Sequence, residues 1–278
     1  MWIELKRKLT AFFQNRQASK DPVLHVGSIE EGIKIAKSEL PSDRVVKLVC
    51  KSHTCFIKKC TVNDEDTVPY SDLIEGEKNS LLFLKEQGVP VPEIIEYCHD
   101  FLVLSDCGSD LRDLILSKNY NPENVRKACF EAGRALARLH MKGISLGRGR
   151  PKDYCWDGRA IRFIDFEQTP KDFDAKTNGR ANLWNFVFHL LRDFARMKRD
   201  GYSEVRSFLE GYVAVDHPST NSAIRQTRFW AQGQRWRAFY FKLIALLRLP
   251  GYNTRHQAMT PAVRMFTHDF DPQSTSET

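Results

Sequence analysis

Paired metal-ligand cysteines are missing from this sequence. It has seven cysteines, but none of them forms a C-x-x-C pair and no close pair of histidines accompanies them. This pattern argues against a zinc site. The odd count, in a chain of 278 residues, argues against a disulfide framework. We therefore expect reduced, mostly buried thiols in a cytosolic protein.

Long apolar runs are also missing. No stretch reaches the roughly 18 apolar residues of a membrane span, and no apolar segment follows Lys6, Arg7 and Lys8, so we expect no secretory signal. Residues 1–20 instead have apolar residues at near-helical spacing, which predicts an amphipathic helix. These residues are Trp2, Leu5, Leu9, Phe12 and Phe13. We favour a helix docked on the body of the protein over one that contacts a membrane surface.

Acidic residues are absent from one long segment near the C-terminal end. Between Asn221 and Thr267 there is no Asp or Glu, although the whole chain has a net charge of +7. The basic residues there are Arg225, Arg228, Arg235, Arg237, Lys242, Arg248, Arg255 and Arg264. They are consistent with an anionic partner such as a phosphorylated glycan, an acidic lipid or nucleic acid, and equally with a solvated helix face. Aromatic residues lie among them, chiefly Trp230 and Trp236, and we expect these to pack.

Local patterns predict strands first and helices later. The first strand pair is interrupted by Lys51-Ser-His-Thr54, and another turns at Asp157-Gly158, a strong hairpin signal. Gly88 and Pro250-Gly251 are placed to end helices. The predicted strands lie in residues 44–60, 101–104 and 154–164, and the predicted helices are 72–87, 110–118, 122–142, 181–199 and 222–249.

This order of elements predicts an α+β fold in which a small sheet-rich lobe precedes a larger helical lobe. We expect an N-terminal extension with the amphipathic helix in residues 1–40, the small lobe in 41–104, the large lobe in 105–268 and a flexible tail in 269–278.

Two carboxylates flank the second predicted hairpin. Asp153 precedes its first strand and Asp165 follows its second strand. Because a hairpin brings its own ends together, both carboxylates are expected at one mouth, where they could hold Mg²⁺ together with phosphate oxygens. The plainer alternative is two exposed acids beside turns.

Five short motifs in this order resemble those of the protein-kinase-like superfamily, in particular the bacterial lipopolysaccharide and Kdo kinases of its RIO-like atypical branch. Asp165, in Phe163-Ile-Asp-Phe-Glu167, matches the metal-binding Asp of D-F-G, and Asp153 matches the Asn that follows the catalytic loop motif H-x-D. Cys55-Phe-Ile-Lys58 is similar to the strand motif V-A-I-K, and Glu77 matches the helix residue that pairs with its lysine.

The resemblance implies a two-lobed protein-kinase-like fold with ATP and Mg²⁺ as cofactors. Lys58 would contact the ATP phosphates, with Lys59 as a rival shifted by one residue, and Glu77 would orient the lysine. Asp153 and Asp165 would hold the metal. The backbone from Ser105 through Asp106 and Cys107 to Gly108 would be the hinge that binds adenine.

Two departures from the family pattern bear on activity. Leu146-Gly147-Arg148 stands where the family has H-x-D, and no glycine-rich loop precedes Lys58. Arg148, or Arg150 nearby, could neutralise charge on a transferring phosphoryl group. Either could instead bind a carboxylate or a carbonyl within the loop, or mark a degenerate site.

By this resemblance we expect an ATP- and Mg²⁺-dependent phosphotransferase that acts on a hydroxyl of an envelope sugar, such as a lipopolysaccharide core or another anionic acceptor. It would work in the cytoplasm or at the inner face of the inner membrane. The chief alternative is a pseudokinase that binds a nucleotide or a partner without turnover. Nucleic acid is the least favoured partner.

Overall fold

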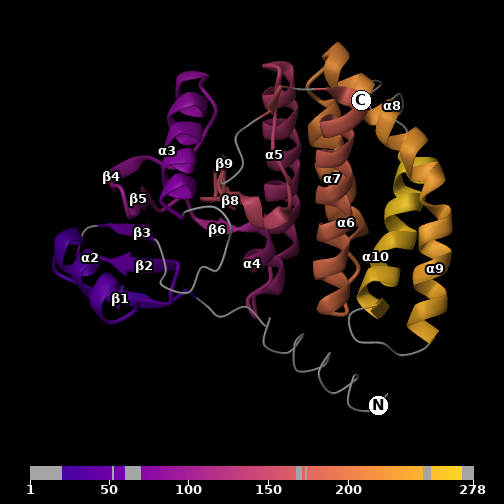
Figure 1. Ribbon diagram of the computed structural model, residues 1–278. Coiled ribbons are helices and arrows are strands. Elements are labelled where there is room, and N and C mark those ends of the chain that lie inside the picture. The colour runs from indigo at the N-terminus through magenta and orange to yellow at the C-terminus, as the bar shows by residue number, and fades with distance from the viewer. Residues whose placement is uncertain are drawn as a thin grey trace. The chain divides into compact units, whose positions relative to one another are not determined.

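The computed structural model describes residues 21–51, 53–59, 70–166, 171–172, 174–246 and 252–270. These form two compact units (Figure 1). The smaller unit contains the described residues up to Gly108 together with 162–166, and the larger unit contains the others. The amphipathic helix predicted in residues 1–20, the tail from residue 271, Cys60 and Glu167 lie outside the described residues.

The smaller unit is a five-stranded sheet with two helices. Its strand order is β1-β2-β3-β5-β4, with β1 parallel to β2 and the other pairs antiparallel. The elements are β1 (Val23–His25), α2 (Ile29–Ser38), β2 (Val45–Val49), β3 (Thr54–Lys59), α3 (Tyr70–Glu86), β4 (Ile94–Cys98) and β5 (Phe101–Ser105).

The hairpin predicted in residues 44–60 is confirmed as β2 and β3. Buried and half-buried residues alternate along both strands, as expected for a sheet with unlike faces. One face packs its apolar side chains into a core with α2. That core includes Val46, Leu48, Cys55, Ile57, Ile33 and Ala36.

Residues 21–40 belong to this sheet unit, whereas we had expected them in an N-terminal extension. β1 pairs with β2, and Ser28 caps α2 by accepting a hydrogen bond from the Glu31 N–H at 3.2 Å. The Glu31 carboxylate in turn accepts the Gly27 N–H at 2.7 Å. This reciprocal capping begins a helix whose apolar residues cover the sheet. The Ser-x-x-Glu spacing was a readable signal of this helix.

The helix predicted over 72–87 is confirmed as α3. Leu81 and Leu84 are buried, as expected for its apolar face, whereas Leu82, which we had expected on the same face, is 45% exposed. Gly88 ends the helix in the left-handed region, with φ +67°, and its N–H donates to the Lys85 carbonyl at 2.9 Å.

The larger unit is mostly helical, so the expected α+β fold of a sheet-rich smaller part and a helical larger part is confirmed. Its helices are α4 (Leu111–Leu116), α5 (Pro122–Met141), α6 (Arg180–Arg196), α7 (Tyr202–Val213), α8 (Pro218–Gly233), α9 (Arg235–Leu246) and α10 (Tyr252–Arg264). Short segments join them: β6 (Ser109–Asp110), β7 (Ile144–Ser145), η1 (Pro151–Asp153), β8 (Tyr154–Trp156), β10 (Lys171–Asp172), η2 (Ala175–Gly179) and η3 (Met265–Asp269). Strand β9 (Ile161–Phe163) crosses from the larger unit to the smaller one.

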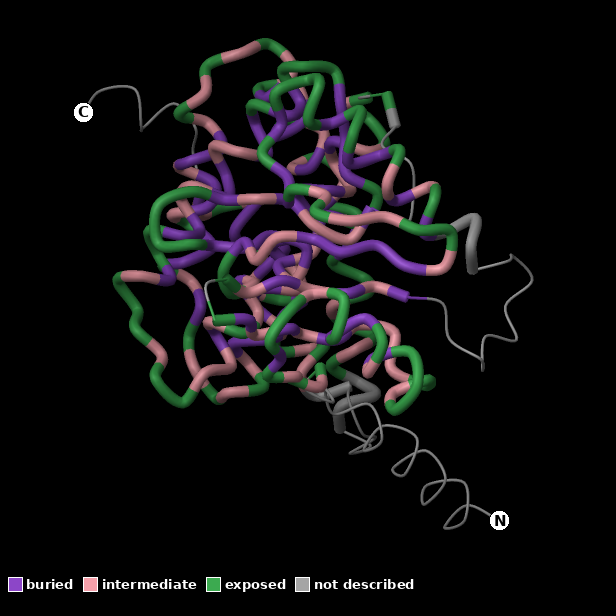
Figure 2. Tube along the Cα trace, turned by 90° about the vertical axis from the view of Figure 1, so that its left-hand side faces the viewer, coloured by how far each residue is buried: buried purple, intermediate pink, exposed green. Residues whose placement is uncertain are grey.

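The core of the larger unit lies between its long helices, of which α5 and α7 run side by side (Figure 1). Large side chains from α6 and α7 fill it, with Phe186 stacked on Phe208 at 3.8 Å between ring centroids. Both residues are fully buried. Figure 2 colours the chain by burial, and buried and exposed stretches alternate along it.

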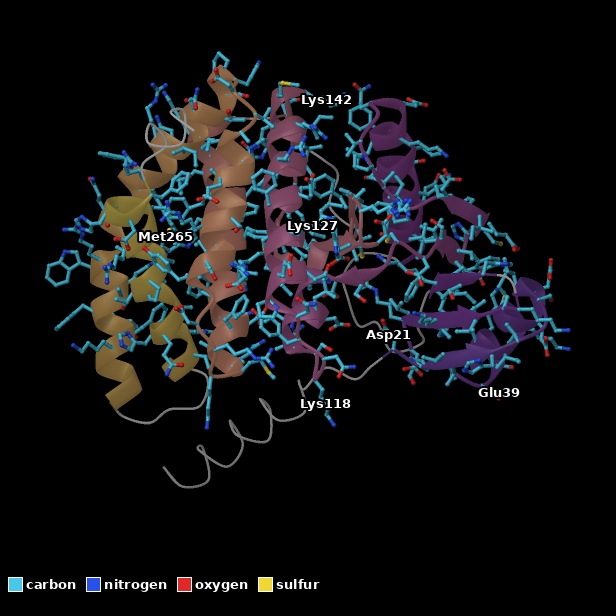
Figure 3. The ribbon with its side chains drawn as sticks, turned by 180° about the vertical axis from the view of Figure 1, so that it is seen from behind. Asp21, Glu39, Lys118, Lys127, Lys142 and Met265 are labelled. Atoms are coloured by element: carbon cyan, nitrogen blue, oxygen red, sulfur yellow. The ribbon has the colours of Figure 1, made fainter. Side chains whose placement is uncertain are left out.

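The single helix predicted over 222–249 is wrong. The chain forms two helices, α8 and α9, separated at Gln234, whose N–H donates to the Ala231 carbonyl at 3.0 Å. Gly233 has a low helix propensity and precedes this break. We had also not predicted α7 or α10. Met265, labelled in Figure 3, is fully buried directly after α10, and Phe270 is buried although we had placed it in the tail.

The aromatic residues of the late helices behave in two ways. Trp230 packs edge-to-face on Trp184 at 4.7 Å between centroids, as expected. Trp236 is 80% exposed, so the prediction that it packs is wrong. Some of the basic residues serve the fold instead of a partner: Arg228 donates to the carbonyls of Phe266 and Phe270 at 3.2 and 2.6 Å.

Candidate functional site

A lysine–glutamate ion pair is the central feature of the smaller unit. Lys58 on β3 donates from Nζ to Oε1 of Glu77 on α3 at 2.6 Å. The side chain of Glu77 is only 3% exposed and that of Lys58 is 15% exposed. The two residues that we expected to pair therefore do so, in an environment that strengthens their attraction because little water screens it.

The choice between Lys58 and Lys59 follows from the alternation of β3. Neighbouring residues of a strand point to opposite faces. Lys59 is buried, and its Nζ donates to the carbonyls of Leu40 and Pro41 at 2.6 and 3.2 Å. Lys59 thus ties the segment before β2 to the sheet. Lys58, on the opposite face of the strand, faces the site.

Asp165 completes this group within the same unit. Its Oδ1 lies 3.8 Å from Lys58 Nζ, and its side chain is 24% exposed. The segment that carries it is held by the Phe163 N–H, which donates to the Pro90 carbonyl at 3.0 Å, and by the buried Phe166. Asp165 has φ +70°, a region that non-glycine residues adopt at some cost and that is concentrated at functional sites. Lysine, glutamate and aspartate are thus held together from β3, α3 and the segment after β9.

The first two N–H groups of the expected hinge already donate hydrogen bonds within the smaller unit. The Ser105 N–H donates to the Glu93 carbonyl at 2.9 Å, and the Asp106 N–H donates to the Thr54 carbonyl at 3.3 Å. The Asp106 carboxylate accepts the Gly108 N–H at 2.8 Å and lies 3.6 Å from Lys47 Nζ. Cys107 is buried. The N–H groups of Ser105 and Asp106 would have to leave these partners to bind a base, and the adenine role stays a prediction.

The loop that we matched to the family's catalytic loop lies in the larger unit, where α6 clamps it. Asn182 accepts the Leu146 N–H at 3.1 Å and donates to the Leu146 carbonyl at 2.6 Å. One turn later, Asn185 donates to the Arg148 carbonyl at 3.0 Å. Our sequence reasoning missed both asparagines, because nothing in a sequence marks which polar residue of a helix faces a distant loop.

A buried histidine supports this clamp. His140 lies 3.1 Å from Asn182 Oδ1 through Nε2 and 2.7 Å from the Tyr212 hydroxyl through Nδ1. An amide oxygen only accepts, so Nε2 carries the proton and Nδ1 accepts from the tyrosine. Burial lowers the pKa of His140 to about 4, which keeps the ring neutral at physiological pH.

Asp153 is the second predicted metal ligand, and it is buried in this same loop. Its Oδ2 accepts the Arg150 N–H at 2.8 Å, and the Asp153 N–H donates to the Arg150 carbonyl at 2.8 Å. Asp153 therefore caps the η1 turn. It belongs to the larger unit and Asp165 to the smaller one, so their convergence on one metal ion stays a prediction.

The two loop arginines differ in exposure. Arg148, at the position where the family has its catalytic aspartate, is exposed. Arg150 is half-buried, and its Nε lies 3.8 Å from Asp153 Oδ2, which matches the carboxylate-binding alternative that we left open for it.

Among the residues that the structure describes, no group of three or more His, Cys, Asp or Glu side chains is arranged to hold a metal ion. Within the same residues, every helix is too short or too polar to cross a membrane.

Comparison with known proteins assigns no family. No family model matches the chain. It is similar to an uncharacterised protein of Haemophilus influenzae, with 29% identity over 126 residues. The match covers 45% of this chain and 49% of the relative, so the chain spans about half the length of the curated relative that it matches.

Proposed function

We propose that this protein is an ATP- and Mg²⁺-dependent phosphotransferase of the protein-kinase-like kind, acting on a hydroxyl of an envelope sugar or a related anionic acceptor. One observation carries the proposal. Within the sheet unit, Lys58 Nζ lies 2.6 Å from Glu77 and 3.8 Å from Asp165. These are the residues to which the resemblance assigns the contact with ATP, the orientation of the lysine and the binding of the metal.

The residues fit the cofactors chemically. A lysine held by a buried glutamate offers a fixed cation to phosphate oxygens, because the ion pair restricts its side chain. A partly exposed aspartate is the kind of ligand that Mg²⁺ takes, since this ion is commonly bound by one or two carboxylates plus substrate phosphates and water. When bound, ATP would supply the transferable phosphoryl group and Mg²⁺ would neutralise part of its charge. Asp165 would hold the metal, with Asp153 as the proposed second ligand.

The loop after β7 would receive the acceptor. Arg148 is exposed there, with its carbonyl held by Asn185, and its guanidinium could balance charge on the transferring group. Such an enzyme would meet its acceptor in the cytoplasm or at the inner face of the inner membrane.

A binding module without turnover is the second candidate, and Arg148 favours it. A guanidinium stays protonated at physiological pH and cannot take a proton from an acceptor hydroxyl. Phosphoryl transfer depends mainly on positioning and charge stabilisation, which is why the enzyme remains our first proposal.

Thermal unfolding with and without Mg·ATP tests the nucleotide site. Binding to the folded state alone raises the unfolding midpoint. We expect a rise at millimolar Mg·ATP in the wild type, and we expect its loss without Mg²⁺, in Asp165→Ala and in Lys58→Met. Lys59→Met is the matched control. It should unfold earlier, because two carbonyls lose their donor, and keep the rise.

Turnover separates the two candidates. ATP hydrolysis or transfer that disappears in Asp165→Ala would eliminate the pseudokinase. If millimolar Mg·ATP does not raise the unfolding midpoint of the wild type, nucleotide binding is excluded for both candidates.

A further inference from the structure

A group of cationic side chains in the larger unit is not used by the proposed nucleotide site. Arg112 comes from α4, Arg150 from the loop before η1, and Arg192 and Arg196 from α6, where His189 lies one turn before Arg192. We call Arg112, Arg150, Arg192 and Arg196 together with His189 the arginine cluster. Burial, followed by the charges of all four arginines, lowers the pKa of His189, so the four charges are close enough to act on one residue.

The cluster holds buried donors without acceptors. Among the described residues, the buried Nε atoms of Arg112, Arg150 and Arg192 and the buried Nδ1 of His189 have no hydrogen-bond partner. Native structures rarely leave such atoms unpaired, because each loses the hydrogen bond that it makes with water in the unfolded chain. The three arginine Nε–H groups can only donate, so they indicate a missing acceptor.

Internal carboxylates do not balance the cluster. Asp193 accepts from Arg196 Nη1 at 3.0 Å, but it lies 3.9 Å from Arg112 Nε. Asp153 lies 3.8 Å from Arg150 Nε, and its Oδ2 already accepts a backbone N–H. Asp110 also lies close enough to Arg112 for their charges to interact. Among the described residues, the four guanidinium groups therefore outnumber the carboxylates shown to act on them. Burial, followed by the charge of Arg196, lowers the pKa of Arg192 to about 10.

The cluster is also reachable from solvent. The side chains of Arg112, Arg150 and Arg196 are 30%, 25% and 39% exposed. An anion arriving at the guanidinium ends can draw the Nε atoms toward it by rotation of the last side-chain bonds. Arginine presents several donors in a planar fork that matches phosphate, so a group of arginines is better suited to a tetrahedral oxyanion than to chloride.

We propose that the arginine cluster binds a phosphate group, and that this group belongs to an acceptor that already carries a phosphate. The second statement rests on the proposed phosphotransferase function, whereas the first does not. The cluster lies in a different unit from Lys58 and Asp165. Its Arg150 belongs to the acceptor loop and also contacts Asp153, the proposed second metal ligand. The different unit and the acceptor loop together favour the acceptor over the nucleotide as the source of the phosphate.

Inorganic phosphate and glucose 6-phosphate are the probes. Thermal unfolding is followed at 10 mM of each, against sodium chloride of equal ionic strength, for the wild type, Arg112→Gln and Arg192→Gln. The matched control is Arg206→Gln, which changes an exposed arginine of α7 that pairs with Glu210 at 2.9 Å. With a millimolar dissociation constant, we expect phosphate to raise the wild-type midpoint by about 3 °C beyond chloride. The cluster variants should bind about tenfold more weakly, and Arg206→Gln should behave as the wild type.

The stability of the variants without phosphate tests the alternative of a structural cluster. Removing one of several like charges should leave the midpoint of Arg192→Gln equal to or above that of the wild type. A variant that unfolds much earlier and keeps the full phosphate shift would overturn the proposal. A wild-type shift no larger than that of chloride, or an equal loss in Arg206→Gln, would overturn it too.

Two further comparisons of the unfolding midpoint identify the source of the phosphate. Lys58→Met should keep the phosphate shift, and Arg192→Gln should keep the Mg·ATP shift. Loss of the phosphate shift in Lys58→Met, or of the Mg·ATP shift in Arg192→Gln, would assign the phosphate to the nucleotide and overturn the acceptor statement. Failure of Mg·ATP alone, with the phosphate results as expected, would reject the phosphotransferase and leave the phosphate site standing.

Discussion

At the scale of single residues, the Lys58–Glu77 pair concentrates both stability and chemistry. The side chain of Glu77 is buried and that of Lys58 is nearly buried. Taking two charges out of water is costly, and their attraction offsets the cost only while both are present. A buried ion pair of this kind is more readily explained by a ligand that needs it than by its contribution to folding.

Unfolding by urea measures how strongly the two residues depend on each other. We expect Glu77→Gln to lower the free energy of unfolding by about 1–3 kcal/mol, because the Lys58 ammonium loses its nearest carboxylate and keeps only the more distant Asp165. The double variant Lys58→Met/Glu77→Leu should lose less than the sum of Lys58→Met and Glu77→Leu, because it leaves neither member of the buried pair without the other. Strictly additive losses would contradict the coupling.

At the scale of elements, the contact between α5 and α7 depends on two glycines. A Cβ on Gly133 would overlap the Phe208 carbonyl, and a Cβ on Gly211 would overlap the Phe130 carbonyl. Each helix therefore offers a glycine to the backbone of the other. This close approach also positions Tyr212, whose hydroxyl supports His140 and, through it, the clamped loop.

The same substitution in two helices should have opposite effects. Gly133→Ala should destabilise the protein by about 1–3 kcal/mol, because the helices must separate to admit a methyl group. Gly76→Ala in α3 meets no atom within 4 Å, and it should stabilise by roughly 0.5–1 kcal/mol through helix propensity. Midpoints from chemical unfolding of the two variants check this. Equal effects would show that helix propensity alone controls both positions.

At the scale of the whole molecule, stability depends on pH through a carboxyl group of the larger unit. Burial, followed by the charge of Asp113, raises the pKa of Asp110 from 3.8 to about 7. Between about pH 4 and pH 7 the folded protein thus holds a proton that the unfolded chain has lost. The contribution of Asp110 to stability is therefore most favourable at low pH and decreases as the pH rises through this window.

Asp110→Asn removes this dependence while it keeps the cap on α4, since an asparagine oxygen can still accept the Asp113 N–H. We expect the variant to be more stable than the wild type at pH 8, by on the order of 1–3 kcal/mol, and nearly equal to it at pH 4.5. Denaturant titrations at the two pH values measure the difference. A gain of equal size at both would rule out titration of Asp110 as its cause.

Local signals in the sequence were sufficient for several features. β-branched and aromatic residues around a short polar break predicted the β2–β3 hairpin, and apolar residues followed by Gly88 predicted α3 and its end. These two features succeed because each rests on the preferences of neighbouring residues. The pairing of Lys58 with Glu77 was instead implied by the resemblance to the protein-kinase-like superfamily. Gly233 was an equally local signal, and we overlooked it when we predicted one helix instead of α8 and α9.

Other features were decided only by the tertiary structure. Lys58 and Lys59 are alike in sequence, and only the register of β3 and the carbonyls of Leu40 and Pro41 distinguish them. Asn182 of α6 holds Leu146 of a distant loop. The arginine cluster joins α4, a loop and α6, although in the sequence each of its arginines resembles an ordinary surface charge. Such groups depend on contacts between segments far apart in the chain, and those contacts form only when the helices pack.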